Sequence, residues 1–176
     1  MMSDIPKSKR AKSPLEALHA AYHLRWRVTA ELMASFAYSE KKLEAHIRKR
    51  TSYIKNDDER TAAIKAIREA EENFAGWFIK RERDRVADFC QGITEHLRAA
   101  NTIYPQYRIE FDERRLEMDK ALECCNKLQD ELQYIAETMP ADKNKYMGAV
   151  LECESVFRQI KALRQSDNRF LKTIKG

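Results

Sequence analysis

The fold class is decided by residues 111–140, which read FDERRLEMDKALECCNKLQDELQYIAETMP. The apolar side chains of this stretch recur mostly at steps of three and four residues: Phe111, Met118, Leu122, Cys125, Leu128, Leu132 and Ile135. This spacing places them on one face of an α-helix. Pro140 cannot continue a helix and marks its end. The stretch therefore predicts an amphipathic helix over about 107–139.

The same spacing recurs on both sides of this stretch and predicts three further helices, over 14–55, 57–100 and 142–174. Each of them is preceded by residues that favour a helix start: Ser13-Pro14 with Glu16, Asn56 followed by acids, and Asp142. A first or second helix that is broken and folds back is the alternative, because helices of about 40 residues are far above the usual length.

Composition agrees with an all-α protein. The 176 residues include only four Gly and four Pro, which leaves few turns for a β fold. Four helices with short connections predict an antiparallel up-down-up-down four-helix bundle over 14–176, in which a long N-terminal helical hairpin overhangs the other two helices. Apolar residues on this overhang predict a homo-oligomer that covers them: Ile47, Tyr53, Ile54, Ile64 and Ile67.

Residues 1–13 predict a basic disordered arm, since four cations stand among Ser and Pro with almost nothing apolar to bury. No stretch of the chain is apolar over the roughly 18 to 20 residues that a membrane span needs. The basic start is also not followed by the apolar segment of a secretory signal. We therefore expect a cytoplasmic protein that does not cross a membrane.

The sequence lacks the motifs of common catalytic and metal sites. It contains no Glu-x-x-His pair, and His19 and His23 stand four residues apart without a second pair of ligands. Its cysteines show no CxxC spacing: Cys90, Cys124, Cys125 and Cys153. Neither a glycine-rich phosphate loop nor a nucleophile elbow occurs. We expect no enzyme, no cofactor and no metal.

Charge is distributed unevenly along the chain. The net charge is +3 over residues 1–14, +4 over 15–55, −2 over 56–100, −4 over 101–140 and +4 over 141–176. Basic outer segments suit contacts with nucleic acid or attraction between subunits. A solvated basic face that binds nothing is the alternative.

The candidate nucleic-acid-binding residues are the cations of the first and last expected helices: Arg25, Arg27, Arg48, Lys49, Arg50, Lys143, Lys145, Arg158, Lys161, Arg164, Arg169 and Lys172. Helical spacing brings Arg158, Lys161 and Arg164 close to one face, from which they could follow a phosphate backbone.

Four segments of the C-terminal half carry a family resemblance: Ala99-Ala100-Asn101-Thr102-Ile103-Tyr104-Pro105, Leu132-Gln133-Tyr134-Ile135-Ala136-Glu137-Thr138-Met139-Pro140, Asn144-Lys145-Tyr146-Met147 and Ile160-Lys161-Ala162-Leu163-Arg164-Gln165-Ser166-Asp167-Asn168. The chain resembles the accessory variability determinant of diversity-generating retroelements. This resemblance implies a small basic homo-oligomer, pentameric in that family, that binds the reverse transcriptase of the element and its template RNA. Lys161 and Arg164 would then be the nucleic-acid contacts.

The basic segments, the absence of catalytic motifs and the family resemblance together predict a non-enzymatic accessory protein of a retroelement. Its expected partners are RNA or DNA, a reverse transcriptase and further copies of the chain, with a pentamer implied by the resemblance. The alternative is a structural or protein-interaction helical bundle of a phage or mobile element that does not bind nucleic acid.

Overall fold

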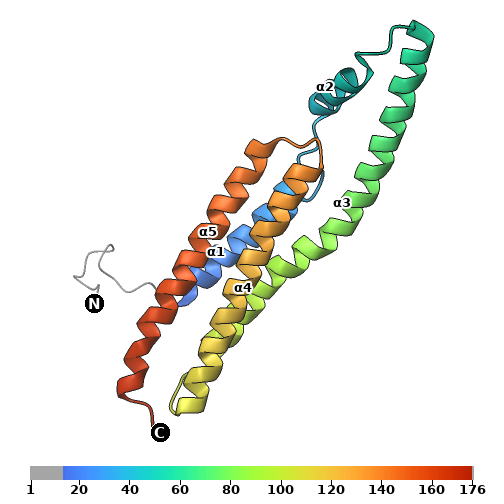
Figure 1. Cartoon of the computed structure of the whole chain (residues 1–176). Coiled ribbons are helices and arrows are strands. Elements are labelled where there is room, and N and C mark those ends of the chain that lie inside the picture. Colours follow the sequence, from blue (N-terminus) through green and yellow to red (C-terminus); the bar gives the residue numbers. More distant parts are fainter. Residues whose placement is uncertain (1–13, 176) are drawn as a thin grey trace.

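The computed structural model describes residues 14–175, and its regular elements are helices (Figure 1). The α-helices are α1 (Pro14–Arg27), α2 (Glu40–Thr51), α3 (Asp57–Thr102), α4 (Arg108–Thr138) and α5 (Lys143–Ser166). A π-helical turn, η2 (Val28–Leu32), follows α1, and a 3-10 helix, η3 (Asp167–Lys172), follows α5. No strand occurs within 14–175, so the all-α prediction is confirmed. The arm expected over 1–13 lies outside the described residues.

Most of the predicted helix ends are confirmed. The side chain of Asn56 accepts hydrogen bonds from the backbone N–H groups of Asp58 and Glu59, and the side chain of Asp142 accepts one from Asn144. These contacts satisfy N–H groups that have no partner inside the first turn of a helix. The last expected helix is shorter than predicted, because α5 ends at Ser166 and the chain continues as η3.

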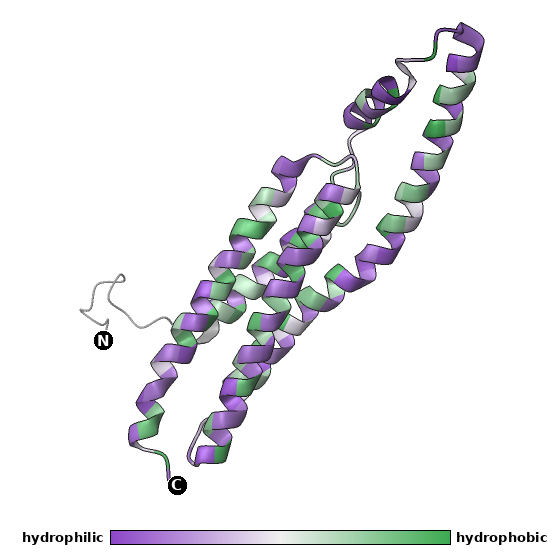
Figure 2. Cartoon of the chain, viewed as in Figure 1, coloured by the Kyte–Doolittle hydropathy of each residue, from purple (hydrophilic) through white to green (hydrophobic). Residues whose placement is uncertain are grey.

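The hydrophobic core lies between α1, α3, α4 and α5, which run in alternating directions (Figure 1). Each of these helices packs against two of the others, and α3 has its most extensive contact with α4. The stripe predicted over 111–135 supplies much of this core, since Met118, Leu128 and Leu132 have no exposed surface. Figure 2 shows hydrophobic residues along these four helices and a mostly hydrophilic α2.

The prediction of one continuous helix over 14–55 is wrong, because the structure has two separate α-helices there. The chain leaves the helical path after η2 and returns to it only at Glu40. Two residues in the break, Phe36 and Ala37, have positive φ angles of 44° and 53°. This left-handed conformation is unfavourable for residues other than glycine. Packing must therefore hold the break in place.

Contacts from distant parts of the chain provide this packing. Phe36 is completely buried, and its carbonyl accepts a hydrogen bond of 2.5 Å from the hydroxyl of Tyr146. The guanidinium of Arg83 donates to the carbonyls of Met33 and Ala34, at 2.9 and 2.6 Å. Buried backbone groups need such partners once they leave a helix, so tertiary contacts outweigh the helical preference of this segment.

Beyond the break, α2 continues away from the bundle and lies along the part of α3 that extends past the other helices (Figure 1). Leu43 and Ile47 of α2 are buried, and Ile64 and Ile67 of α3 are half-buried. The overhang exists as predicted, but α2 covers its isoleucines at least partly, while Tyr53 stays 78% exposed. Uncovered isoleucines on the overhang therefore no longer support a homo-oligomer.

The two glycines of α3 lie in different surroundings. A Cβ atom built on Gly92 would stand 2.7 Å from the sulfur of Cys124, so α3 and α4 approach closely there. A Cβ atom on Gly76 would meet no atom within 4 Å. Only Gly92 is needed for helix packing.

We expect Gly76→Ala and Gly92→Ala to change stability in opposite directions. Gly76→Ala should raise the free energy of unfolding by about 1 kcal/mol, because alanine is the better helix former. Gly92→Ala should lower it by about 1 to 3 kcal/mol through overpacking against Cys124. Urea denaturation followed by circular dichroism measures both. Adding Cys124→Ala should restore most of the loss at Gly92, and a loss that persists in this double variant would contradict the packing explanation.

Candidate nucleic-acid interface

Four of the predicted nucleic-acid-binding residues are engaged within the protein. Arg27 lies 3.1 Å from Glu152 and 3.2 Å from Glu31, and its hydrogen bond to Glu152 raises the pKa of the guanidinium. The other three contact residues that are remote in sequence: Arg25 with Thr94 at 3.4 Å, Arg50 with Glu71 at 3.7 Å, and Arg164 with Asp119 at 2.7 Å. Arg27 and Arg164 are thus neutralised by carboxylates, whereas Arg25 contacts a neutral hydroxyl and Arg50 remains 55% exposed.

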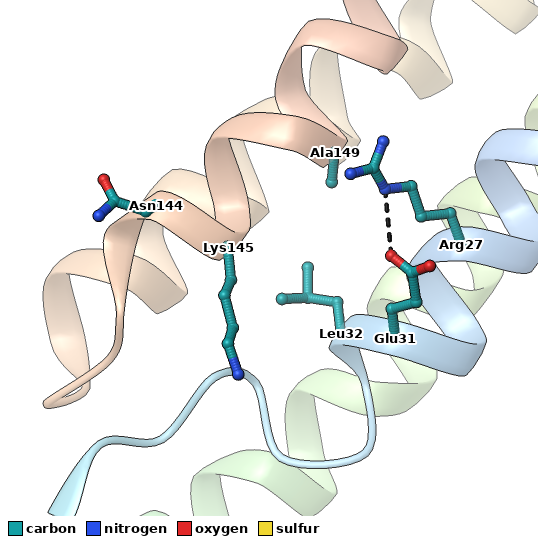
Figure 3. Close-up of a pocket in the computed structure, with 6 residues that line it drawn as sticks. All are labelled: Arg27, Glu31, Leu32, Asn144, Lys145 and Ala149. Atoms are coloured by element: carbon teal, nitrogen blue, oxygen red, sulfur yellow. Dashed lines mark hydrogen bonds and ion pairs between the residues drawn. The ribbon is translucent and has the colours of Figure 1, made fainter.

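Arg27 links α1 to α5 through its ion pair with Glu152. Its guanidinium passes over Gly148, where a Cβ atom would stand 2.5 Å from a guanidinium nitrogen. A cavity of about 300 Å³ opens beside it and is lined also by Glu31 and Lys145. Figure 3 shows Arg27 turned toward α5 and Lys145 extending from α5 toward the segment after η2. Arg27 and Lys145 thus share one hollow, but only Lys145 has its charge free.

The remaining cations of α5 are exposed and lack acidic partners. Within the described residues, Lys143, Lys145, Arg158 and Lys161 form no ion pair. Lys161 instead lies over the ring of Phe157, at 5.0 Å from its centroid. Arg158 and Lys161 are three residues apart and share the outward side of α5. They form the part of the predicted helix face that the structure leaves free.

The neighbouring helix α4 shows the opposite arrangement, because each of its cations contacts a polar or acidic side chain. The pairs are Arg108 with Asp112, Arg114 with Asp167, Arg115 with Asn168, Lys120 with Glu117, and Lys127 with Glu123. The pKa of Glu117 is lowered by its hydrogen bond to Lys120. Of these two neighbouring helices, α5 therefore carries more free positive charge than α4.

Two further predicted residues lie on α2. Arg48 and Lys49 are exposed and form no ion pair with the residues of 14–175. Arg48 lines a groove of about 260 Å³ between α2 and α3, together with Arg60 and Arg68. Arg68 is neutralised there by Glu40 and Glu44. This second basic surface lies on α2, beyond the end of the bundle at which α5 begins (Figure 1), whereas Arg158 and Lys161 stand in the second half of α5.

Arg169 and Lys172 lie in η3 and not on a continuation of α5. The C-terminal segment folds under the bundle end, where Lys175 donates its backbone N–H to the carbonyl of Gln106 at 2.9 Å. This places η3 beside the α3–α4 connection and its two exposed tyrosines, Tyr104 and Tyr107. Sequence reasoning treated that connection as a linker. In the sequence, this surface is indicated by aromatic residues that stand close to cations in both 104–108 and 169–172.

The pKa values of two buried cysteines and one buried glutamate are raised. Burial raises the pKa of the Cys90 thiol to about 12, and hydrogen bonding to Cys153 and burial raise the pKa of Cys125. These thiols are therefore protonated at neutral pH and poor nucleophiles. Burial and the adjacent Glu82 raise the pKa of Glu131, which pairs with Arg85 at 2.9 Å.

The structure offers no site for a metal or a membrane span in the part of the chain that it describes. No three His, Cys, Asp or Glu side chains of residues 14–175 are grouped so that they could hold a metal ion. None of the helices described has the length and apolar character that a membrane crossing requires. Comparison with known protein families, curated proteins and solved structures gives no significant match.

Proposed function

We propose that the protein is a non-enzymatic accessory protein that binds nucleic acid through α5 and the C-terminal segment. One observation carries this proposal: the cations of α5 other than Arg164 are exposed and free of acidic partners, whereas every cation of α4 contacts an acidic or amide side chain. Unpaired cations on one helix attract phosphates because binding releases the counterions of the nucleic acid. Arg158 and Lys161 are the principal contacts.

The identity of the partners rests on the sequence resemblance. It supports a reverse transcriptase as the protein that this chain assists and a homo-oligomer, with five copies, as its working form. The acidic α4, with a net charge of −4 over 101–140, and the basic C-terminal part, with +4 over 141–176, also suit attraction between copies. The basic α2 surface at Arg48 and Lys49 would add contacts with the same nucleic acid.

Light scattering at two salt concentrations tests this function. We expect a defined mass for the protein alone, and an increase in mass when a structured RNA is added at ~50 mM salt that is lost at ~200 mM. This loss reflects the competition of salt ions for the phosphates. A mass that does not respond to RNA at either concentration would contradict nucleic-acid binding.

A second candidate function, a protein-interaction bundle, is supported by an exposed aromatic cluster where α3 leaves the core. Phe74 stacks on Phe78 at 5.4 Å, and Tyr134 of α4 lies 5.6 Å from Phe78. Trp77 is 55% exposed beside them, with Arg81 over its ring at 5.3 Å. Trp, Tyr and Arg are the residues most often found at the energetic centres of protein interfaces. Association through this cluster would persist at high salt.

A further inference from the structure

We propose that the end of the bundle formed by the α3–α4 connection and η3 binds single-stranded nucleic acid, with bases stacked on Tyr104 and Tyr107. The proposal rests on the proposed function and names the part of the nucleic acid that the protein recognises. We call this surface the tyrosine end, and it comprises Tyr104, Tyr107, Arg169, Lys172 and Lys175.

The tyrosine end is built from two segments that are remote in sequence. Lys175 donates its backbone N–H to Gln106, and the backbone N–H of Arg108 donates to the carbonyl of Lys175 at 3.1 Å. These bonds form a short parallel bridge between Tyr107 and Lys175. The bridge fixes the cations of the C-terminal segment beside the tyrosines of the connection.

Both tyrosine rings present surface to solvent. Tyr104 is 73% exposed and Tyr107 is 48% exposed. Phe170 makes an edge-on contact with Tyr104, with 5.5 Å between the ring centroids, and an open hollow of about 490 Å³ lies beside Tyr107. Exposed aromatic faces of this kind accept nucleic-acid bases, at about 1 to 3 kcal/mol for each stacked base.

The cations around the rings give the surface the charge that a phosphate backbone requires. Arg169, Lys172 and Lys175 are exposed and form no ion pair within 14–175. Lys175 lies 5.9 Å from the centroid of Tyr107, and Arg169 lies 5.0 Å from that of Phe170. Base stacking next to phosphate contacts is the recognition mode of single-strand-binding proteins.

The α3–α4 connection that carries the tyrosines is held by hydrogen bonds and a buried ion pair. Arg114 is buried, pairs with the fully buried Asp167 at 2.6 Å, and donates to the carbonyl of Ile103 at 3.0 Å. Glu110 accepts hydrogen bonds from the backbone N–H groups of Gln106 and Tyr107, at 2.7 and 3.0 Å. The connection is therefore ordered before a ligand arrives, which lowers the entropic cost of binding.

Single strands are favoured over duplexes by this geometry. A duplex keeps its bases stacked inside and offers only edges and phosphates to a protein, whereas a single strand can place unstacked bases on aromatic rings. The tyrosine end presents two exposed tyrosine side chains from the short connection between α3 and α4. An anionic membrane surface is the competing ligand, since apolar Ile109 and Leu171 are also exposed here.

Binding of a fluorescein-labelled 12-nucleotide oligouridine and of a 12-base-pair RNA duplex by the full chain tests the proposal. The variant Tyr104→Ala with Tyr107→Ala should bind the oligouridine at least ~10-fold more weakly than the wild type and the duplex equally well. Tyr104→Phe with Tyr107→Phe keeps the rings and should bind both like the wild type. Tyr53→Ala, at an exposed tyrosine remote from this end, is the matched control and should bind unchanged.

The outcomes separate this proposal from the proposed function. If the alanine variant binds oligouridine as tightly as the wild type, the tyrosine end is not a binding surface. The proposal that α5 binds nucleic acid would remain intact. A wild-type chain that binds neither RNA would overturn both. Binding to phosphatidylserine vesicles that the alanine variant loses, without any effect on RNA, would assign the surface to membranes and overturn the proposal. Circular dichroism melting shows whether each variant is folded, and these exposed positions should leave the melting temperature unchanged.

Discussion

Arg114→Met should lower the free energy of unfolding by roughly 3 to 5 kcal/mol, the usual cost of removing one partner of a buried ion pair. Arg114 is 5% exposed and Asp167 is 0% exposed. The guanidinium also donates to the carbonyls of Ala100 and Ile103 at the end of α3. Methionine fills a similar volume but leaves the carboxylate and both carbonyls without these partners. Urea denaturation at pH 7 measures the loss.

The double variant Arg114→Met with Asp167→Leu is the control for this explanation. It removes both charges from the interior, so it should lose less stability than Arg114→Met alone, despite carrying one more substitution. A loss below about 1 kcal/mol for Arg114→Met, or a double variant less stable than the single one, would show that the pair does not hold this end of the bundle together.

Arg158→Glu with Lys161→Glu should weaken RNA binding by at least about 100-fold at low salt, because two phosphate contacts become repulsive. Both side chains are exposed and unpaired, so the variant should melt near the wild-type temperature. Fluorescence anisotropy with a labelled structured RNA measures the affinity. Arg164 is unsuitable for this test, because its bond to Asp119 would be lost together with its charge.

The matched control is Lys65→Glu with Lys127→Glu, which changes the net charge by the same amount. These two lysines are exposed but pair with Glu69 at 4.0 Å and with Glu123 at 2.6 Å. We expect this control to lose much less affinity than the α5 variant. Equal losses would mean that the overall charge of the protein, and not the position of the α5 cations, determines binding.

The sequence was sufficient to predict α3, α4 and the start of α5, because the signals for them are local. Asn56, Asp142 and Pro140 act on the residues next to them, and the structure places α3, α4 and α5 accordingly. The break after η2 has no such signal, since 33–39 contain neither glycine nor proline. It is stabilised by Arg83 and Tyr146, which lie 50 and 110 residues away from the carbonyls of Met33 and Phe36 that they contact. Contacts of this kind become visible only in three dimensions.

The same distinction applies to the candidate interface. The sequence identifies the cations of α5 but not which of them are neutralised. Arg164 of α5 pairs with Asp119 of α4, and Arg27 of α1 pairs with Glu152 of α5. The tyrosine end was missed for a related reason, because Tyr104 and Phe170 meet only when η3 folds under the α3–α4 connection. The sequence locates the cations along each helix, but the tertiary structure determines which of them lack an acidic partner.

The salt dependence of RNA affinity tests most directly whether the unpaired cations of α5 and the C-terminal segment contact phosphates. The dissociation constant for a single-stranded RNA is measured by anisotropy between ~50 and ~200 mM salt. Each phosphate contact adds about 0.7 to the slope of the logarithm of affinity against the logarithm of salt. The account predicts a slope of about −3 for four contacts, reduced by about 1 or more when Arg158 and Lys161 are reversed. A slope near zero, or one that the reversal leaves unchanged, would contradict it.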